Sequence, residues 1–202
     1  MKTLLLIDVQ NDFMPGGALP VPSGNEILPV INALLPKFDL VVATQDWHPT
    51  NHKSFASNHK GRKEFEAIDL NGVEQTLWPD HCIQNSSGAE FHPHLKDNPV
   101  EAIFRKGMDP EIDSYSGFFD NARKKSTGLA GYLREKGTTE LFLCGLAADI
   151  CVYYTLLDAL EAGFSATLIE DASRPWDVEG FGLVKGKMIA KGGRIVSSSD
   201  LF

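Results

Sequence analysis

The sequence has few cysteines and no long apolar run, and both features limit where the protein works. Three of its 202 residues are cysteine. An odd and small number supplies no disulfide framework and is typical of a reducing compartment. No stretch approaches the roughly 20 consecutive apolar residues that cross a bilayer. The apolar run at residues 1–6 meets an acid at Asp8, so it is too short for a signal peptide and indicates a strand. We therefore expect a cytoplasmic protein with no membrane partner.

Positive charge is also scarce. Lysine and arginine total 19 against 27 aspartates and glutamates, which gives a net charge of -8. No basic run or basic amphipathic helix is present. This balance argues against nucleic acid or an acidic membrane surface as the main partner.

Internal repeats, low-complexity tracts and linkers are missing as well. The hydrophobic fraction of 43% is ample for a continuous core. A chain of this length falls within the roughly 50–250 residues of one domain. We expect a single domain over residues 1–202, and the sequence leaves open whether it forms a homo-oligomer.

Short apolar runs alternate with helical patterns along most of the chain. Six runs predict strands, at residues 3–7, 39–44, 100–104, 141–144, 166–169 and 195–196. Helical periodicity follows a capping-box spacing at 23–26 and recurs at about 127–136, 150–162 and 178–190, with Gly137 and Gly163 as stops. This alternation predicts a doubly wound, three-layer α/β/α fold with a central, mostly parallel six-stranded sheet.

Two segments interrupt the alternation. Residues 46–99 carry all six histidines and little periodic pattern, and residues 106–120 are rich in Gly, Asp and Ser. Ligands of open α/β sheets bind beyond the carboxyl ends of the strands, and long irregular segments there are usually functional.

Three reactive side chains fall at predicted strand ends. Asp8 ends the first run, Lys106 follows the third, and Cys151 lies where the fourth run gives way to a Gly turn and a helix. A thiol in the first turn of a helix has its pKa lowered by the helix dipole. The acid could take the thiol proton, and the ammonium could stabilise carboxylate and thiolate. Taken singly, each has a plainer alternative: Asp8 as a capping residue, Lys106 as a surface lysine, Cys151 as core.

A second group suggests a metal. Asp46 and His48 are two residues apart at a strand end, and His81 follows in the irregular segment. One carboxylate and two imidazoles suit zinc or iron. The alternative is a set of ordinary loop polar groups, and other candidate ligands compete: His52, His59, His92, His94 and Cys82. Phe13 and Trp78, nearby in sequence, could form flat walls for an aromatic ligand or could be core.

Six segments together resemble one enzyme family. They are IDVQNDF at 7–13, QDWHP at 45–49, WPDHC at 78–82, RKG at 105–107, DSYSGF at 113–118 and GLAADICV at 145–152. The chain resembles, over nearly its whole length, the nicotinamidases (pyrazinamidases) among the isochorismatase-like cysteine hydrolases. The two histidine-bearing segments are the more specific, because members of the superfamily that lack the metal lack these histidines.

The resemblance implies an activity and a site. The activity is hydrolysis of nicotinamide to nicotinate and ammonia through a thioester, in NAD salvage, with pyrazinamide to pyrazinoate as a related reaction. Asp8, Lys106 and Cys151 become the catalytic triad. One divalent metal ion, zinc or iron with manganese as a third candidate, becomes the cofactor, held by Asp46, His48 and His81.

The resemblance also implies how the substrate is held. Phe13 and Trp78 would sandwich the ring, and Tyr115 would contribute to the same pocket. The backbone N–H groups of Ala147 and Cys151 would form an oxyanion hole, and the peptide Leu146–Ala147 matches the family's cis bond.

Some features depart from the family or stay open. Ala148 and Ile150 replace residues common in relatives, and segment 174–193, which matches least, is expected to lie away from the chemistry. An amidase for another small amide or carbamoyl compound, and a catalytically silent binding protein, are the competing hypotheses. The metal's identity, a role for His52 or Glu64 in its shell, and the resting protonation of Cys151 are not fixed by the sequence.

Overall fold

A six-stranded parallel sheet forms the centre of the molecule, as predicted. The computed structural model describes residues 1–201. The strand order is β5-β2-β1-β6-β7-β8, and every neighbouring pair is parallel. The bounds are β1 Lys2–Ile7, β2 Leu40–Asp46, β5 Val100–Lys106, β6 Glu140–Gly145, β7 Ser165–Ser173 and β8 Arg194–Val196.

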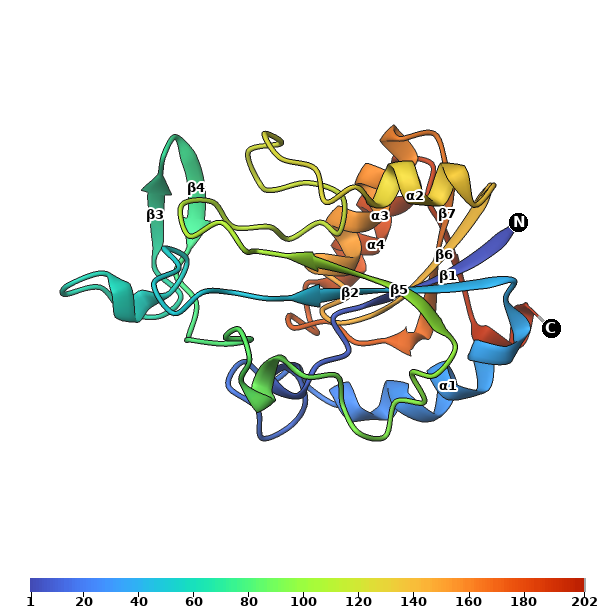
Figure 1. The fold of residues 1–202 in the computed structure, drawn as a ribbon, viewed down its shortest axis with the longest axis horizontal. Helices are drawn as coiled ribbons and strands as arrows, with labels where there is room; N and C mark the ends of the chain where they lie inside the picture. Colours follow the sequence, from blue (N-terminus) through green and yellow to red (C-terminus); the bar gives the residue numbers. More distant parts are fainter. Residues whose placement is uncertain (202) are drawn as a thin grey trace.

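Helices cover both faces of this sheet, which gives the predicted three layers (Figure 1). Leu4 and Leu6 of β1 belong to the same core cluster as α1 (Ile27–Leu34). Leu5 and Ile7 belong to the cluster on the other face. The helices that contribute to that second cluster are α2 Leu129–Glu135, α3 Cys151–Glu161 and α4 Phe181–Ala190. Both faces of β1 are buried, so side chains on either face are apolar, which explains its unbroken apolar run.

The ends of the helices follow their local chemistry, with one exception. Gly137 and Gly163, at φ 74° and 89°, lie just beyond α2 and α3, where a left-handed residue ends a helix. Pro29 falls in the first turn of α1, where proline is tolerated. The predicted capping box is wrong: Ser23 is itself left-handed at φ 54° and makes no capping hydrogen bond, and a 3-10 turn, Gly24–Glu26, precedes the helix.

The histidine-rich segment contains a hairpin that the hydrophobic pattern did not reveal. Strands β3 (Ala67–Leu70) and β4 (Val73–Thr76) pair antiparallel at one end of the molecule, beyond the central sheet (Figure 1). Their turn is Asn71–Gly72, with φ of 55° and 84°. An Asn-Gly pair with positive φ at both residues is the strongest short hairpin signal, so the sequence did carry it.

None of the helices in residues 1–201 is long and apolar enough to cross a membrane.

Candidate active site

The three predicted reactive residues come together at the carboxyl ends of the strands. Asp8 follows β1, Lys106 is the last residue of β5, and Cys151 is the first residue of α3, just after β6. Strands β1 and β6 are direct neighbours, and β2 lies between β1 and β5. The chain therefore leaves the sheet at one edge at all three places, as the parallel order requires.

Lys106 is the centre of this group. Its Nζ lies 2.9 Å from Asp8 Oδ2, 3.1 Å from Asp46 Oδ1 and 3.6 Å from Cys151 Sγ. It also donates to the carbonyl of Ser114 at 3.0 Å. All these side chains are buried. One ammonium thus balances two buried carboxylates and contacts the thiol.

Asp8 is held as an acceptor for several donors. The hydroxyl of Thr44 donates to its Oδ1 at 2.7 Å, and its own N–H donates back to Thr44 Oγ1 at 3.3 Å. The Lys106 ammonium lies 2.9 Å from its Oδ2. Burial raises the pKa of Asp8, and the Lys106 ammonium opposes that rise. The carboxylate is therefore a stronger base than an exposed aspartate.

The thiol of Cys151 does not have the lowered pKa that its helix position predicted. Burial raises its pKa well above the ordinary value. Lys106 lowers it, but Asp8 and Asp46 raise it further by their negative charge. The raised pKa favours a thiol beside a carboxylate base over a preformed thiolate. The prediction from the helix dipole was wrong because it did not account for the burial of the sulfur, to which the charges of Asp8 and Asp46 add.

Asp46, His48 and His81 form a compact buried cluster. Asp46 Oδ2 lies 3.0 Å from His48 Nε2 and 3.4 Å from His81 Nε2. The Nδ1 atoms of the two histidines lie 2.8 Å from the carbonyls of Gly107 and Pro79. Since a carbonyl only accepts, each Nδ1 carries a proton, and Nε2 of each ring is the nitrogen that faces the carboxylate. The carboxylate oxygen and the two nitrogens all lie within 4.8 Å of one another, a spacing at which they could hold one metal ion.

This donor set fits the metal ion that the sequence suggested. One carboxylate oxygen and two imidazole nitrogens suit zinc or iron, with positions left for water or ligand. The other histidines do not share in this cluster: His59 Nε2 binds the carbonyl of Lys53, and His92 and His94 pack against each other. Cys82 belongs to the apolar core. Glu64 is exposed and lines a separate surface hollow.

His52 lies beside the cluster and not within it. Its Nδ1 accepts from the N–H of Ser54 at 3.1 Å, so the proton of the neutral ring is on Nε2. That Nε2 is buried and has no hydrogen-bond partner in the described chain. Burial and the neighbouring His48 lower the pKa of His52 to about 4, so the ring is neutral at pH 7. His52, His48 and Asp113 form a second group of potential ligand atoms.

Two further residues position the cluster, and their roles were not recognised in the sequence. Gln10 donates to the carbonyl of Asp46 and accepts from its N–H, both at 2.8 Å. Gly107 has φ 66°, and a Cβ there would lie 2.4 Å from Cε1 of His48. Gln10 lies two residues after Asp8, and Gly107 directly follows Lys106; both lie inside segments that resemble the family. The sequence signals that could have revealed them were a glutamine just beyond the first strand and a glycine directly after the last residue of another strand.

A narrow pocket runs between the thiol and the metal-ligand cluster. It has a volume of about 30 Å³. Its lining includes all three predicted substrate-binding residues, Phe13, Trp78 and Tyr115, together with Cys151, Ala147, Asp46 and His81. The Tyr115 hydroxyl accepts from Trp78 Nε1 at 3.3 Å and from Gln75 Nε2 at 3.2 Å, which fixes the aromatic wall.

Trp176 also lines this pocket. The expectation that segment 174–193 lies away from the chemistry is therefore wrong at its beginning. The reason is a long-range contact: the carboxylate of Asp149 accepts from the N–H groups of Trp176 and Asp177, at 2.8 and 2.7 Å. The N–H of Ala148 donates to the carbonyl of Arg174 at 2.8 Å. The loop after β7 is thus fastened to the turn that carries the thiol.

The turn before Cys151 presents two backbone donors. The peptide Leu146–Ala147 is cis, as the resemblance implied. The hydrogen bonds of residues 1–201 include no acceptor for the N–H of Ala147 or of Cys151. Both residues line the pocket. The arrangement offers a thiol, a base, two free N–H donors and a cation site around one small cavity.

Comparisons with known proteins agree with this geometry. A family model for the isochorismatase domain matches residues 2–199. Nicotinamidase from Escherichia coli is 47% identical over 88% of this chain and 85% of its own length. A nicotinamidase/pyrazinamidase structure from Acinetobacter baumanii has a TM-score of 0.97 and 45% identity, covering 100% of this chain and 98% of its own. Pyrazinamidase from Pyrococcus horikoshii in complex with zinc has a TM-score of 0.79 and 38% identity, covering 97% and 98%.

Proposed function

This chain belongs to the isochorismatase family, and from that premise we propose that it is a metal-dependent amidohydrolase that converts nicotinamide to nicotinate and ammonia through a thioester on Cys151. Pyrazinamide, with the same carboxamide on a similar ring, would be a second substrate. The nicotinate released would be available for NAD salvage. The relatives named above support the proposed substrate, and the buried residues around the pocket support the proposed mechanism.

One observation supports the mechanism above the others. A single buried ammonium, Lys106 Nζ, contacts Asp8, Asp46 and Cys151 within 3.6 Å. Burying a charge is costly unless it is paired, so this arrangement indicates a function beyond packing. It joins a nucleophile, its base and a metal-ligand cluster in one network.

The first step is attack on the amide carbon. Asp8 takes the thiol proton, and the sulfur of Cys151 forms a bond to the carbonyl carbon. As Asp8 becomes neutral, the Lys106 ammonium is left to stabilise the developing negative charge on sulfur. The carbonyl oxygen becomes an oxyanion, which the N–H groups of Ala147 and Cys151 would hold. Each such donor typically contributes about 2.7–4 kcal/mol to the transition state.

The remaining steps release the products. Asp8 returns the proton to the amide nitrogen, the carbon–nitrogen bond breaks, and ammonia leaves an acyl thioester on Cys151. A water molecule, deprotonated by Asp8, then attacks the thioester carbon, and the carbon–sulfur bond breaks. Asp8 returns the proton to the sulfur to restore the thiol, and the carboxylic acid ionises, its proton going to ammonia. One water is consumed, and no oxidant or reductant is needed.

Asp46, His48 and His81 would hold the divalent metal ion. When bound, the ion would supply a Lewis-acid anchor for the ring nitrogen of the substrate. Phe13 and Trp78 would pack against the faces of the ring, and Tyr115 would close the side of the pocket. Orienting the amide carbon over the sulfur in this way removes much of the entropic cost of attack.

An ammonia-release assay tests the proposal directly. Purified, metal-loaded enzyme is given nicotinamide, pyrazinamide and several non-aromatic amides. We expect the two ring amides to have the highest kcat/KM. A preference for the non-aromatic amides would instead favour an amidase for another small amide, and no ammonia from any amide would reject the activity.

A further inference from the structure

An aromatic pair packs against the wall of the pocket, and the proposed chemistry does not use it. Phe65 and Trp176 stack with ring centroids 5.5 Å apart and planes 27° apart. Both pack edge-on against Trp78, with centroids at 6.2 and 6.1 Å. Trp78 is buried in the pocket wall, whereas Phe65 is 50% exposed and Trp176 is 38% exposed. Large exposed rings held together at the rim of a cavity suggest a role at its entrance.

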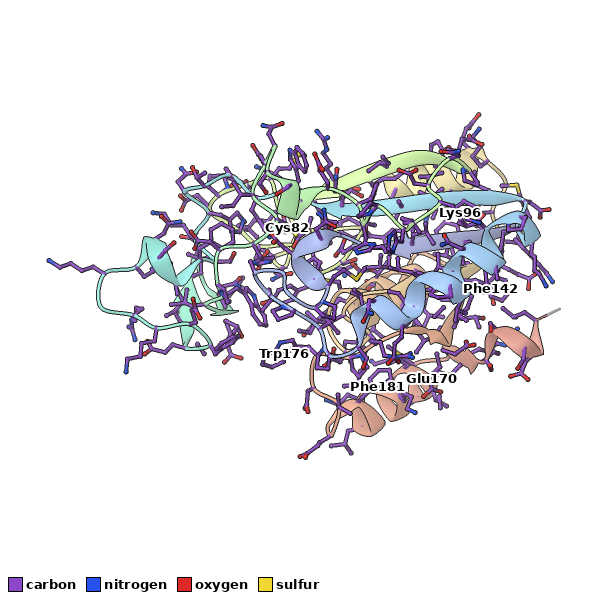
Figure 2. All side chains as sticks on the ribbon, turned by 90° about the horizontal axis from the view of Figure 1, so that it is seen from below. Cys82, Lys96, Phe142, Glu170, Trp176 and Phe181 are labelled. Carbon is purple, nitrogen blue, oxygen red and sulfur yellow. The ribbon has the colours of Figure 1, made fainter. Side chains whose placement is uncertain are left out.

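Trp176 marks the mouth of the pocket. Trp176 is the most exposed of the described residues that line the pocket. Figure 2 shows it on the part of the body that faces the segment carrying β3 and β4. Phe65 comes from the chain just before β3 and Trp176 from the chain after β7, so the stacked rings belong to segments far apart in the sequence.

The two rings differ from the rest of the pocket in how they are held. The backbone at Trp176 is fixed to Asp149, and the N–H of Phe65 donates to the carbonyl of Leu77 at 2.6 Å. The indole packs against the rings of Phe65 and Trp78, and no hydrogen bond of the described chain involves its Nε1. The indole can therefore turn about its side-chain bonds without breaking a hydrogen bond, while its backbone stays in place.

The pocket leaves little free space for a ring substrate. Its volume of about 30 Å³ is room for roughly one or two water molecules. A pyridine carboxamide is far larger. In the wall, buried Phe13 is fixed by core packing and partly buried Tyr115 by hydrogen bonds. The exposed ring at the mouth is the element that can move with the least loss of contact.

We propose that Trp176, supported by Phe65, is a specificity-determining gate. The indole turns outward to admit a single-ring amide and closes over it, which excludes water and adds a ring contact to the bound substrate. A ring system that extends toward the mouth holds the gate open and is discriminated against. This inference rests on the proposed amidase activity for its substrates, but the gate itself is a property of ligand binding.

The test compares four variants of the metal-loaded enzyme with the wild type on nicotinamide and quinoline-3-carboxamide, which carries a second fused ring. Trp176→Ala should raise the KM for nicotinamide by roughly two- to tenfold, the range of one aromatic contact, with kcat nearly unchanged. It should raise the kcat/KM ratio of quinoline-3-carboxamide to nicotinamide by about tenfold. Trp176→Phe should restore most of the discrimination. Phe65→Ala should shift the ratio the same way by a smaller factor.

Leu183→Ala is the control. It removes an apolar side chain that is 77% exposed on α4, outside the pocket, and should change neither the KM for nicotinamide nor the kcat/KM ratio.

An unchanged ratio in Trp176→Ala, or an equal loss of kcat on both substrates, would overturn the gate. If Trp176→Ala does not fold, Phe65→Ala decides, because it leaves every lining residue in place. Calorimetric binding of nicotinate and quinoline-3-carboxylate separates the two proposals. A wild type that releases no ammonia from nicotinamide rejects the proposed function. A Trp176→Ala variant with unaltered relative affinity for the two carboxylates rejects the gate.

Discussion

Lys106 and Asp46 form a buried ion pair that joins the two halves of the site. Nζ lies 3.1 Å from Oδ1, while Oδ2 of the same carboxylate faces His48 and His81. The same ammonium contacts the sulfur of Cys151. The position of the nucleophile and the position of the metal-ligand cluster are therefore set by one side chain. A change at Lys106 should disturb both.

We expect Lys106→Met to abolish ammonia release and to destabilise the fold. The substitution leaves the carboxylates of Asp8 and Asp46 buried without their counter-ion, which typically costs about 3–5 kcal/mol of unfolding free energy. Urea unfolding and the ammonia assay measure the two effects. Lys125→Met is the matched control, because Lys125 pairs with Asp109 at the exposed surface and should matter little to either. Equal effects of the two substitutions would contradict the central role of Lys106.

Cys151→Ala should remove all amidase activity while leaving the fold intact. The sulfur is the only atom of the site placed to form the proposed thioester, and the lost side chain is small. Mass spectrometry of the wild type quenched during turnover should show an acyl adduct on Cys151. Cys144→Ala serves as control, since Cys144 is buried in the core cluster on the α1 face and does not line the pocket. More than a few per cent of residual activity in Cys151→Ala would exclude it as the nucleophile.

Much of this site could be predicted because parallel sheets place reactive residues in a regular way. The burial of Leu4 to Ile7 on both faces shows in the sequence as an unbroken apolar run, and the polar residue that ends such a run must lie at the binding edge. Asp8 and Lys106 were found by that rule. Asp46 and His48 followed from their spacing at the next strand end.

The features of the site that the sequence did not predict depend on contacts between distant segments. The raised pKa of the Cys151 thiol comes from burial among carboxylates contributed by other strands, which no local pattern reports. Trp176 reaches the pocket because Asp149, 27 residues earlier, fixes its backbone. The hairpin at Asn71–Gly72 is a different case, since its turn signal was local and was overlooked amid a weak hydrophobic pattern.

Gly107→Ala should weaken metal binding more than it weakens the fold. The new Cβ would lie 2.4 Å from His48 Cε1, so the imidazole must move from its place opposite Asp46. Metal content after dialysis and the metal dissociation constant measure this. Gly192→Ala is the control, because Gly192 also has positive φ, 95°, but nothing lies within 4 Å of its added Cβ. Both variants should lose about 1–2 kcal/mol of stability from the left-handed backbone, and only Gly107→Ala should lose metal. Full metal content in Gly107→Ala would contradict the assignment of His48.

Removal of the metal ion should impair binding of the substrate more than the covalent chemistry. Asp46 and His81 of the metal-ligand cluster line the pocket, and so does Cys151, but the ion would hold the ring and not the sulfur. We expect chelation to raise the KM for nicotinamide strongly, and zinc, iron or manganese to restore it. Nicotinate binding by calorimetry should weaken in parallel. A chelated enzyme without bound ion that keeps its full kcat/KM would rule out the anchoring role.

The activity should depend on the ionisation of Asp8 and not on a preformed thiolate. Burial raises the pKa of Asp8, so kcat/KM should fall as the pH drops through a value above the roughly 3.9 of a free aspartate.

Burial also raises the pKa of Cys151, so the free enzyme should hold a thiol at neutral pH. Alkylation by iodoacetamide in the absence of substrate should therefore be slow at pH 7 and should increase well into the alkaline range, while amide hydrolysis is already fast. Substrate turnover and alkylation then have separate pH profiles. Rapid alkylation that stays constant from pH 6 to 8 would show a resting thiolate–lysine pair instead, and Asp8 would lose its role as the base of the first step.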